Sequence, residues 1–275
     1  MSTKFKKSLL SIGLIILSIA CLCPFLIMMV NATRGGREIM TSFTLIPGNA
    51  LIENWKTMTG YFNIFKGLEN SLIIAVCCTV LTAYFSALTA YAFAIYKFKG
   101  SRIIFTAIIV LMMVPAQLGL LGFYDLVNSM NLVDTYIPLI VPAIASPATV
   151  FFLRQYVLAT LPPALIEAAR IDGASELRIF HEIAVPIMAP GIATMSIGTF
   201  IGSWNNYLTP LVLLLSPEKF TLPVMMASMR SSQDITSNMG AIYLTVAISV
   251  LPIMITFAFC SKYIIGSISA GGVKE

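Results

Sequence analysis

Six long apolar stretches constrain this chain more than any other feature of its sequence. A helix needs about 20 apolar residues to cross the hydrocarbon core of a bilayer, and each stretch reaches that length. Of the 275 residues, 58% are hydrophobic and only 11% are charged, whereas soluble domains are about one quarter charged. The sequence therefore predicts an all-α integral membrane protein, a single domain over 1–275, with six transmembrane helices near 9–30, 71–96, 103–126, 136–157, 187–215 and 241–265.

The first stretch begins after three lysines, as the apolar part of a signal peptide would. It continues through Val30, however, and exceeds the about 7–15 apolar residues of a signal peptide. We therefore expect an uncleaved first helix.

Basic residues are distributed unevenly between the loops. The short turn 97–102 carries Lys97, Lys99 and Arg102, whereas the loop 127–135 carries no Lys or Arg. Positive charge is retained on the cytoplasmic side of a membrane protein. The sequence thus predicts a multi-pass membrane protein with both termini in the cytoplasm. The net charge of +5 then mainly reflects the basic residues that keep the inner loops in the cytoplasm. No nucleic-acid partner is expected from it.

The six stretches contain no Asp, Glu, Lys, Arg or His in their interiors. Proton-coupled carriers need such a group, which disfavours an independent secondary carrier or channel, although sodium coupling through backbone carbonyls stays open. The chain also has no phosphate-binding loop for ATP, no nucleophile elbow and no metal-binding motif. We expect no catalytic residue, metal or cofactor in this chain, and energy from another chain.

The loop 158–186 is predicted to form two short helices at an angle. Pro162-Pro163 suits a helix start, Gly173 suits the left-handed residue that ends it, and Ser175 suits the cap of the next helix. Pro186 is expected to stop that second helix and open the fifth span. Such a unit can dock into a cleft on a cytosolic partner, but a helical connector on the membrane surface has the same periodicity.

This loop also carries a family motif. Glu167-Ala168-Ala169, followed by Gly173, Ile183 and Val185-Pro186, resembles the EAA motif of ABC importer permeases, with Val185 where leucine is usual. The extension Asp172-Gly173-Ala174-Ser175 is similar to the carbohydrate-uptake subfamily, the maltose-type importers. Residues 31–34 with 45–48, and 204–211, resemble further segments of that subfamily. Residues 221–224 and 266–274 resemble the second of its two permeases.

The resemblance implies a transmembrane permease subunit of a binding-protein-dependent importer for a sugar or oligosaccharide, in the bacterial cytoplasmic membrane. Its implied partners are a second homologous permease, a cytosolic ATPase dimer that holds ATP and Mg, and an extracytoplasmic sugar-binding protein reached by the loop 216–240. Glycerol-phosphate importers share the scaffold, so a phosphorylated substrate stays open. The loop 158–186 would seat in the ATPase, with Glu167 as the charged contact. The candidate coupling residues are Glu167, Ala168, Ala169, Asp172, Gly173, Ile183 and Pro186.

Four polar and aromatic residues lie in the predicted fifth span: Trp204, Asn205, Asn206 and Tyr207. Amides in lipid are costly unless they are paired, so these side chains should face other helices or a water-filled cavity. Aromatic rings beside amides suit a sugar, which offers apolar C–H faces and hydroxyls. Hydrogen bonding between helices fits the same residues equally well, and both interpretations stand at this point.

Overall fold

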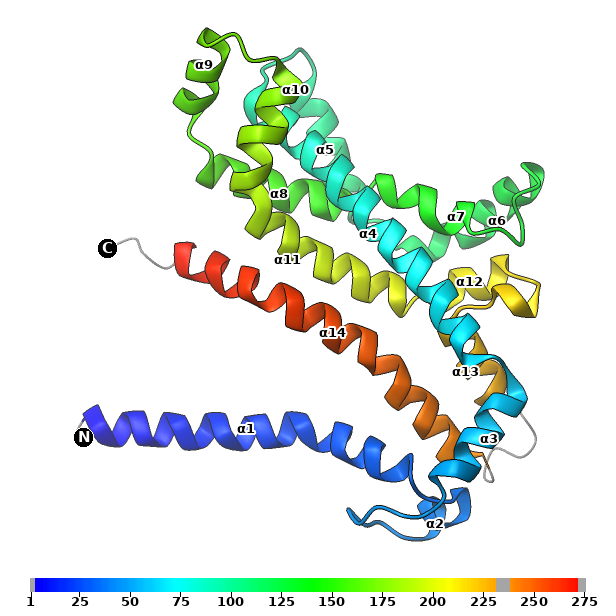
Figure 1. Cartoon of the computed structure of the whole chain (residues 1–275). Coiled ribbons are helices and arrows are strands. Elements are labelled where there is room, and N and C mark those ends of the chain that lie inside the picture. Colours follow the sequence, from blue (N-terminus) through cyan, green and yellow to red (C-terminus); the bar gives the residue numbers. More distant parts are fainter. Residues whose placement is uncertain (1–2, 231–237, 272–275) are drawn as a thin grey trace. The chain divides into compact units, whose positions relative to one another are not determined.

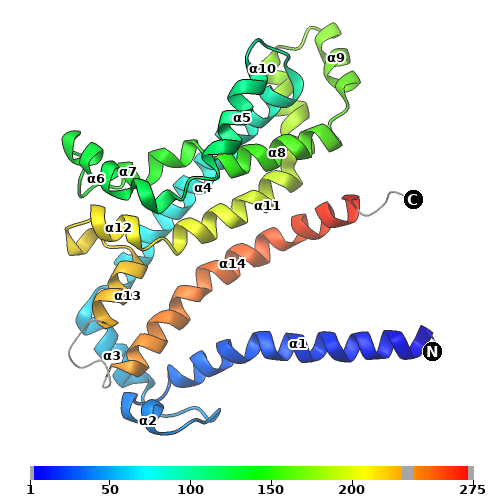
Figure 2. The ribbon, with the colours of Figure 1, turned by 180° about the vertical axis from the view of Figure 1, so that it is seen from behind.

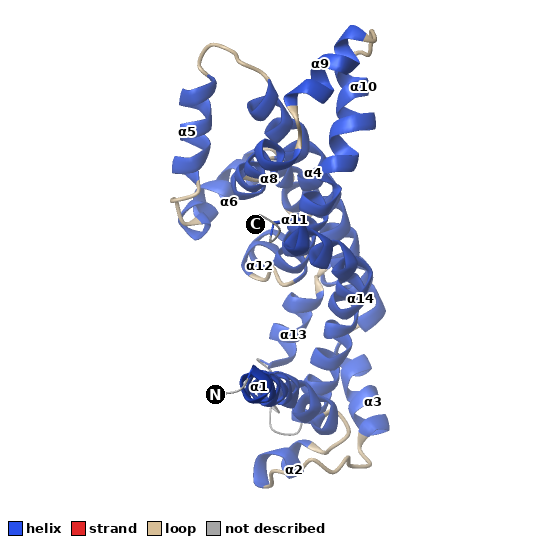
Figure 3. Cartoon of the chain, turned by 90° about the vertical axis from the view of Figure 1, so that its left-hand side faces the viewer, coloured by secondary structure: helices blue, strands red, loops and turns tan. Residues whose placement is uncertain are grey.

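The computed structural model describes residues 3–230 and 238–271, and these residues form helices and turns without a strand (Figure 3). The chain divides into two compact units: the first comprises 1–68 and 222–252, the second 69–221 and 253–275. Within the described residues, five helical segments are long and apolar enough to cross a membrane: Lys7–Asn31, Ile64–Ile95, Ile137–Thr160, Glu176–Trp204 and Met239–Phe259. The predicted all-helical membrane architecture is confirmed, and the sixth span is treated below.

The first unit is organised around a buried arginine in the loop after the first long helix. Its helices are α1 (Thr3–Asn31), α2 (Gly36–Thr41), α3 (Leu51–Tyr61), α13 (Leu222–Arg230) and the first part of α14 (Met239–Gly271) (Figure 1). The Arg34 guanidinium donates to the Ser42 hydroxyl at 2.7 Å and to the Glu38 carbonyl at 3.0 Å. Asn54 donates to the carbonyls of Ala32 and Arg34. The loop is thereby held by buried hydrogen bonds that satisfy the charge.

The second unit holds the core on which the predicted coupling loop rests. Its longest helix, α4 (Ile64–Ile95), begins in the first unit, and α8 (Pro147–Thr160) packs against α11 (Val185–Trp204) (Figure 2). The other helices are α5 (Ser101–Leu111), α6 (Leu120–Ser129), α7 (Ile137–Ile140), α9 (Pro163–Ile171), α10 (Glu176–Ile179) and α12 (Leu208–Leu213). Short 3₁₀ turns are η1 (Ala116–Gly119), η2 (Val141–Ile144) and η4 (Pro217–Lys219), and η3 (Phe180–Ala184) is a π-helical turn.

The predicted third span, 103–126, is not one continuous helix. Helix α5 ends at Leu111, the chain turns through 112–115, and α6 begins only at Leu120 after η1. Pro115 has an extended backbone with φ −61° and ψ 123°. Proline has no N–H for an intrahelical bond and disfavours helix in the residue before it, which accounts for the break.

The predicted fourth and fifth spans are interrupted as well. The fourth breaks at 145–146, before Pro147 opens α8, and the fifth breaks at 205–207, between α11 and α12. Pro210 lies in the first turn of α12, where its missing N–H leaves no bond unmade. Residues 205–207, expected inside a continuous span, therefore lie in a break between two helices, with Trp204 at the end of α11.

Candidate functional site

The turn between α9 and α10 has the geometry that the sequence predicts. Gly173 has a φ of +80°, which confirms it as the left-handed residue. The Ala174 N–H donates to the Ala169 carbonyl at 3.0 Å, and the Gly173 N–H donates to the Arg170 carbonyl at 3.1 Å. This pair of bonds is a Schellman motif, and it satisfies carbonyls that the end of α9 leaves free. The turn therefore sets the angle between the two helices of the loop.

The expected stop at Pro186 is wrong. Helix α10 continues through the π-helical turn η3 into α11, with Pro186 in the first turn of α11. The Val185 N–H donates to the Phe180 carbonyl, five residues back. Such a widened turn accommodates the proline, which cannot donate to the carbonyl four residues earlier. Ser175 does occupy the cap position before α10, but its hydroxyl makes no capping bond.

The inner face of the loop is packed against α4 and α8. Ile166 and Ala169 of α9, with Ile179 and Phe180, belong to one buried cluster. The Phe180 and Tyr91 rings are 5.5 Å apart, and Ile183 packs on the same cluster while partly exposed. Because buried side chains interlock with little free volume, the inner face of the loop forms one packed unit with α4 and α8. The remaining members of the cluster are Ala87, Ala90, Leu153, Val157, Leu161, Ala184 and Met188.

A charged cluster braces α9 against α10 and the end of α4. Arg170 Nε donates to Glu176 Oε1 at 2.7 Å, and the Tyr96 hydroxyl donates to Glu176 Oε2. The Arg170 guanidinium also lies 5.6 Å from the centroid of the Tyr96 ring. Burial and the bond to Glu176 raise the pKa of Tyr96, and donation to Glu176 raises the pKa of Arg170. Sequence reasoning missed this brace, because only the folded turn brings 170 and 176 together.

The outer face of the loop is exposed and mixes apolar with acidic side chains. Glu167, Ala168 and Asp172 are exposed, as is Pro186. Three large apolar side chains are also exposed on this loop, Leu165 at 42%, Ile171 at 86% and Leu177 at 63%. Apolar side chains gathered on an exposed loop are typical of a surface that binds a partner. The predicted coupling residues thus divide into an exposed set and the inward Ala169 and Ile183.

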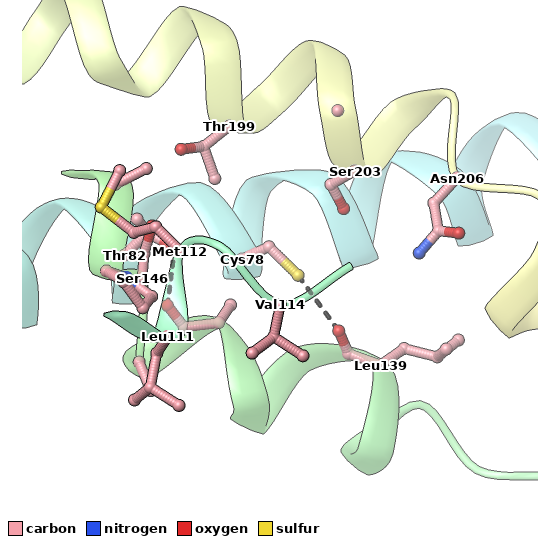
Figure 4. A pocket seen from close by; sticks show the side chains of 15 residues that line it. Cys78, Thr82, Leu111, Met112, Val114, Leu139, Ser146, Thr199, Ser203 and Asn206 are labelled. Atoms are coloured by element: carbon pink, nitrogen blue, oxygen red, sulfur yellow. Dashed lines mark hydrogen bonds between the residues drawn. The ribbon is translucent and has the colours of Figure 1, made fainter. Parts of the chain in front are cut away.

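The breaks in the helices meet at a cavity of about 570 Å³ in the second unit (Figure 4). Two α4 side chains bind carbonyls of the segment before α8: Thr82 donates to Ala143 at 2.7 Å, and the Cys78 thiol donates to Leu139 at 3.3 Å. Backbone groups at broken helices are tolerated at membrane depth where they line a cavity or find such partners. The cavity is lined by Cys78, Thr82, Leu111, Met112, Val114, Leu139, Ala143, Ala145, Ser146, Pro147, Ala148, Thr199, Gly202, Ser203 and Asn206.

The four residues predicted either to line a sugar pathway or to bond between helices have different surroundings. Trp204 is buried, and its ring stacks on Phe200 with the centroids 5.9 Å apart. The Asn205 amide donates back to the Ile201 carbonyl at 3.0 Å. Asn206 lines the cavity described above and also two smaller ones of about 410 and 370 Å³, and Tyr207 lines the first of these.

Sequence reasoning missed the other polar residues of the cavity. Thr199 and Ser203 are four positions apart on α11, and they point to the same side as Asn206 in Figure 4. Cys78 and Thr82 are likewise four positions apart on α4. Residues three and four apart share one face of a helix, so polar stripes in these spans were a usable signal.

A second polar cluster joins the loop before α7 to the loop after α12. Asp134 has a φ of +61° and accepts bonds from the N–H groups of Leu215 at 2.9 Å and Ser216 at 3.0 Å. It also accepts from the Ser216 hydroxyl at 2.5 Å and from Lys219 Nζ at 3.0 Å. The bonds from Ser216 foremost lower the pKa of Asp134 below its usual range. We call Asp134, Leu215, Ser216 and Lys219 the loop clamp.

The predicted loop 216–240 is described only in part. Its first residues enter the loop clamp and α13, while 231–237 lie outside the described residues, as do 272–275 of the tail.

Comparison with known proteins places the whole chain among membrane components of importers. Residues 80–268 match the family described as binding-protein-dependent transport system inner membrane component. The arabinooligosaccharides transport system permease protein AraQ of Bacillus subtilis is 35% identical over 272 residues, covering 96% of this chain and 95% of the relative. The diacetylchitobiose uptake system permease protein NgcG of Streptomyces coelicolor is 30% identical, covering 94% and 86%. The sn-glycerol-3-phosphate transport system permease protein UgpE of Salmonella choleraesuis is 28% identical, covering 98% and 96%.

The fold also matches a solved structure. A bacterial ABC transporter involved in the import of the acidic polysaccharide alginate contains a chain with a TM-score of 0.81 to this one. The match covers 96% of this chain and 99% of the other at 20% sequence identity. At that sequence identity the likeness establishes the fold of this chain. It does not identify the solute that the chain transports.

Proposed function

Because this chain belongs to the family of binding-protein-dependent transport system inner membrane components, and so is a non-catalytic permease subunit, we propose that it imports a sugar or oligosaccharide. The observation that carries the proposal is the match to an arabinooligosaccharide permease over nearly the full length of both chains. A second relative at 30% identity is named for diacetylchitobiose, whereas the relative named for sn-glycerol 3-phosphate is 28% identical. The sugar class is therefore favoured over a phosphorylated cargo.

Transport requires partners, since this sequence carries no phosphate-binding loop of its own. We infer an assembly with a second homologous permease, a cytosolic ATPase dimer that holds ATP and Mg, and an external sugar-binding protein. ATP closes the ATPase dimer, the loops of the two permeases are drawn together, and the pathway changes the side to which it opens. The packed inner face of the loop supports this role, because it connects α9 and α10 directly to α4 and α8.

The outer face of the loop is proposed to seat in the ATPase. Glu167 and Ala168 would contact it together with the exposed apolar side chains of Leu165, Ile171 and Leu177. Gly173 and Asp172 would hold the turn, while Ala169 and Ile183 anchor the loop from inside, and Pro186 marks the start of α11. The exposure of the first set and the packing of Ala169 and Ile183 support this division of roles.

Six crossings remain the proposed topology, with the whole chain acting as one transmembrane domain over 1–275. Helix α5 has 11 residues and would be about 16 Å long at 1.5 Å per residue, too short to cross alone. We propose that α5, η1 and α6 together make the third crossing. The basic turn 97–102 then lies in the cytoplasm with both termini, as the charge distribution favours.

Reconstitution of the complete importer in lipid vesicles tests the function. The chain, a second permease, the ATPase and the binding protein should together take up arabinotriose, diacetylchitobiose or maltotriose when ATP is present. Omission of ATP, or of the second permease, is the matched control and should abolish uptake. Uptake by this chain alone would instead establish a secondary carrier. Uptake of sn-glycerol 3-phosphate without any of the three sugars would overturn the sugar assignment.

A further inference from the structure

Three cavities of the second unit adjoin one another at the broken ends of the helices. The largest, of about 570 Å³, shares Leu139 and Asn206 with one of about 370 Å³. That one in turn shares Leu120, Asn206 and Thr209 with a third of about 410 Å³. Each has the volume of an ordinary small-molecule site, about 300–1,000 Å³. Asn206 lies at the point where all three meet.

The polar groups that line these cavities are all uncharged. They are hydroxyls, amides, a thiol and backbone carbonyls, and no acidic or basic side chain occurs among the described lining residues. Hydroxyls and carboxamides both donate and accept hydrogen bonds, as sugar hydroxyls do. The polar side chains are Cys78, Thr82, Ser146, Thr199, Ser203 and Asn206 in the largest cavity, with Gln117, Asn205, Tyr207 and Thr209 in the other two.

Asn205 and Asn206 differ in whether their amides are already used. The Asn205 amide donates to the Ile201 carbonyl at 3.0 Å within its own helix end. The Asn206 carboxamide makes no hydrogen bond to any part of the chain that the structure describes, although it is directed into the largest cavity (Figure 4). Asn206 is exposed where the three cavities meet, so its amide can exchange water for a ligand.

We propose that these cavities form a binding path for an uncharged saccharide, in which Asn206 determines specificity, and that the path excludes phosphorylated and acidic sugars. This inference rests on the proposed function and adds the class of sugar and the site that selects it. An anion entering the path would lose its water without meeting a cation among the described lining residues of this chain, which is costly at membrane depth. The shared fold does not decide this, because a transporter of an acidic polysaccharide has it too.

Two asparagines provide a matched pair for the test, one lining the cavities and one outside them. In the complete importer, with arabinotriose as the probe, Asn206→Ala should lower uptake per assembled complex roughly five- to tenfold, the loss expected for one hydrogen bond. Asn128→Ala should stay within about twofold, since Asn128 is exposed on α6 and lines none of the three cavities. The yield of assembled complex should match the wild type in both variants. Equal uptake by Asn206→Ala and the wild type would overturn the assignment, while the wild-type uptake itself would still support the proposed function.

Thiol protection tests the path and its charge selection directly. Ser203→Cys, in a chain whose five natural cysteines are replaced by serine, should react with a methanethiosulfonate reagent more slowly during arabinotriose transport. Ser129→Cys, at the end of α6 and outside all three cavities, should show no protection. An unchanged rate at position 203 would overturn the path. Protection by sn-glycerol 3-phosphate as strong as by arabinotriose would overturn the exclusion of charged sugars.

Discussion

Glu167 shows how one side chain can differ in role from its immediate neighbours. It is exposed on α9, whereas Ile166 beside it is buried on the inner face. Glu167→Lys should therefore leave the packing of the loop intact and act on the proposed ATPase contact. Like charges forced together in an interface cost on the order of several kcal/mol, so substrate-stimulated ATPase activity should fall strongly. The measurement is ATP hydrolysis by the reconstituted complex with and without transported sugar.

Glu182→Lys is the matched control for that charge reversal. Glu182 is also exposed, but it pairs with Arg178 one turn away at 2.8 Å. An exposed pair of this kind contributes only about 0.3–0.5 kcal/mol, so stimulated activity should change little. If both variants lose stimulation equally, the net charge of the loop is responsible, and the specific contact of Glu167 is refuted.

Gly173 allows the turn to be tested without a change in packing. A side chain there would have open space around it, so only the φ of +80° opposes substitution. Gly173→Val should cost at least roughly 1–2 kcal/mol in the turn, reorient α10 relative to α9 and weaken co-purification of the ATPase. Gly173→Asn is the control, because asparagine tolerates left-handed backbone and should retain binding. ATPase retention by the valine variant would contradict the turn's role in assembly.

At the residue scale, the sequence predicts the local backbone conformation of a residue better than it predicts which side chains that residue will contact. Gly173 predicts the turn from sequence, because few other residues adopt a left-handed backbone conformation. The contacts of Arg170 cannot be predicted from the sequence, since Glu176 and Tyr96 come within reach of its guanidinium only after the turn has formed. The sequence marks both Asn205 and Asn206 as candidates. Only the end of α11 decides that the Asn205 amide bonds the Ile201 carbonyl while the Asn206 amide does not bond that helix.

At the scale of elements, the loop clamp ties the segment before α7 to the segment after α12. Asp134 accepts from two N–H groups, a hydroxyl and Lys219, and these bonds lower its pKa. A group with a lowered folded pKa stabilises the fold fully above its unfolded value, about pH 4, and loses that contribution as pH falls toward the folded value. Asp134→Asn should therefore lower thermal stability at neutral pH and flatten its decline in acid.

Thermal unfolding of the detergent-solubilised protein between neutral and acidic pH measures this effect. Asp125→Asn is the control, because Asp125 is exposed on α6 and takes no part in the loop clamp. It should leave the pH profile unchanged. An Asp134→Asn profile parallel to that of the wild type would show that the clamp does not depend on the charge of this carboxylate.

The elements also show where hydropathy is informative and where it fails. Apolar length locates the membrane helices, because it measures the burial of side chains in lipid. It does not show whether a helix is continuous, since the breaks at 112–115 and 205–207 lie in apolar surroundings. Pro115 predicts the break at 112–115, because proline disfavours helix in the residue before it. The cavity itself could not be predicted from the sequence, because it forms only where three separate helix breaks meet in the fold.

For the whole molecule, the number of crossings decides on which side the termini lie. Five helical segments qualify as spans by length and composition among the described residues, and the α5–α6 segment is the proposed sixth. An odd number of crossings would put the termini on opposite sides of the membrane, and an even number puts them on the same side. The third crossing thus determines whether the loop of α9 and α10 can meet a cytosolic ATPase.

Reporter fusions test this directly. Alkaline phosphatase, which is active only outside the cytoplasm, should be inactive when fused after Lys99 and active when fused after Asn131, because α5, η1 and α6 lie between these two residues. Green fluorescent protein, which fluoresces in the cytoplasm, should be bright when fused after Glu275. Fusions after Lys4 and Lys219 serve as references for the inner and outer sides in the proposed topology. Equal phosphatase activity after Lys99 and Asn131 would mean that the broken segment turns back without crossing, and the coupling loop would then lie on the wrong side for an ATPase.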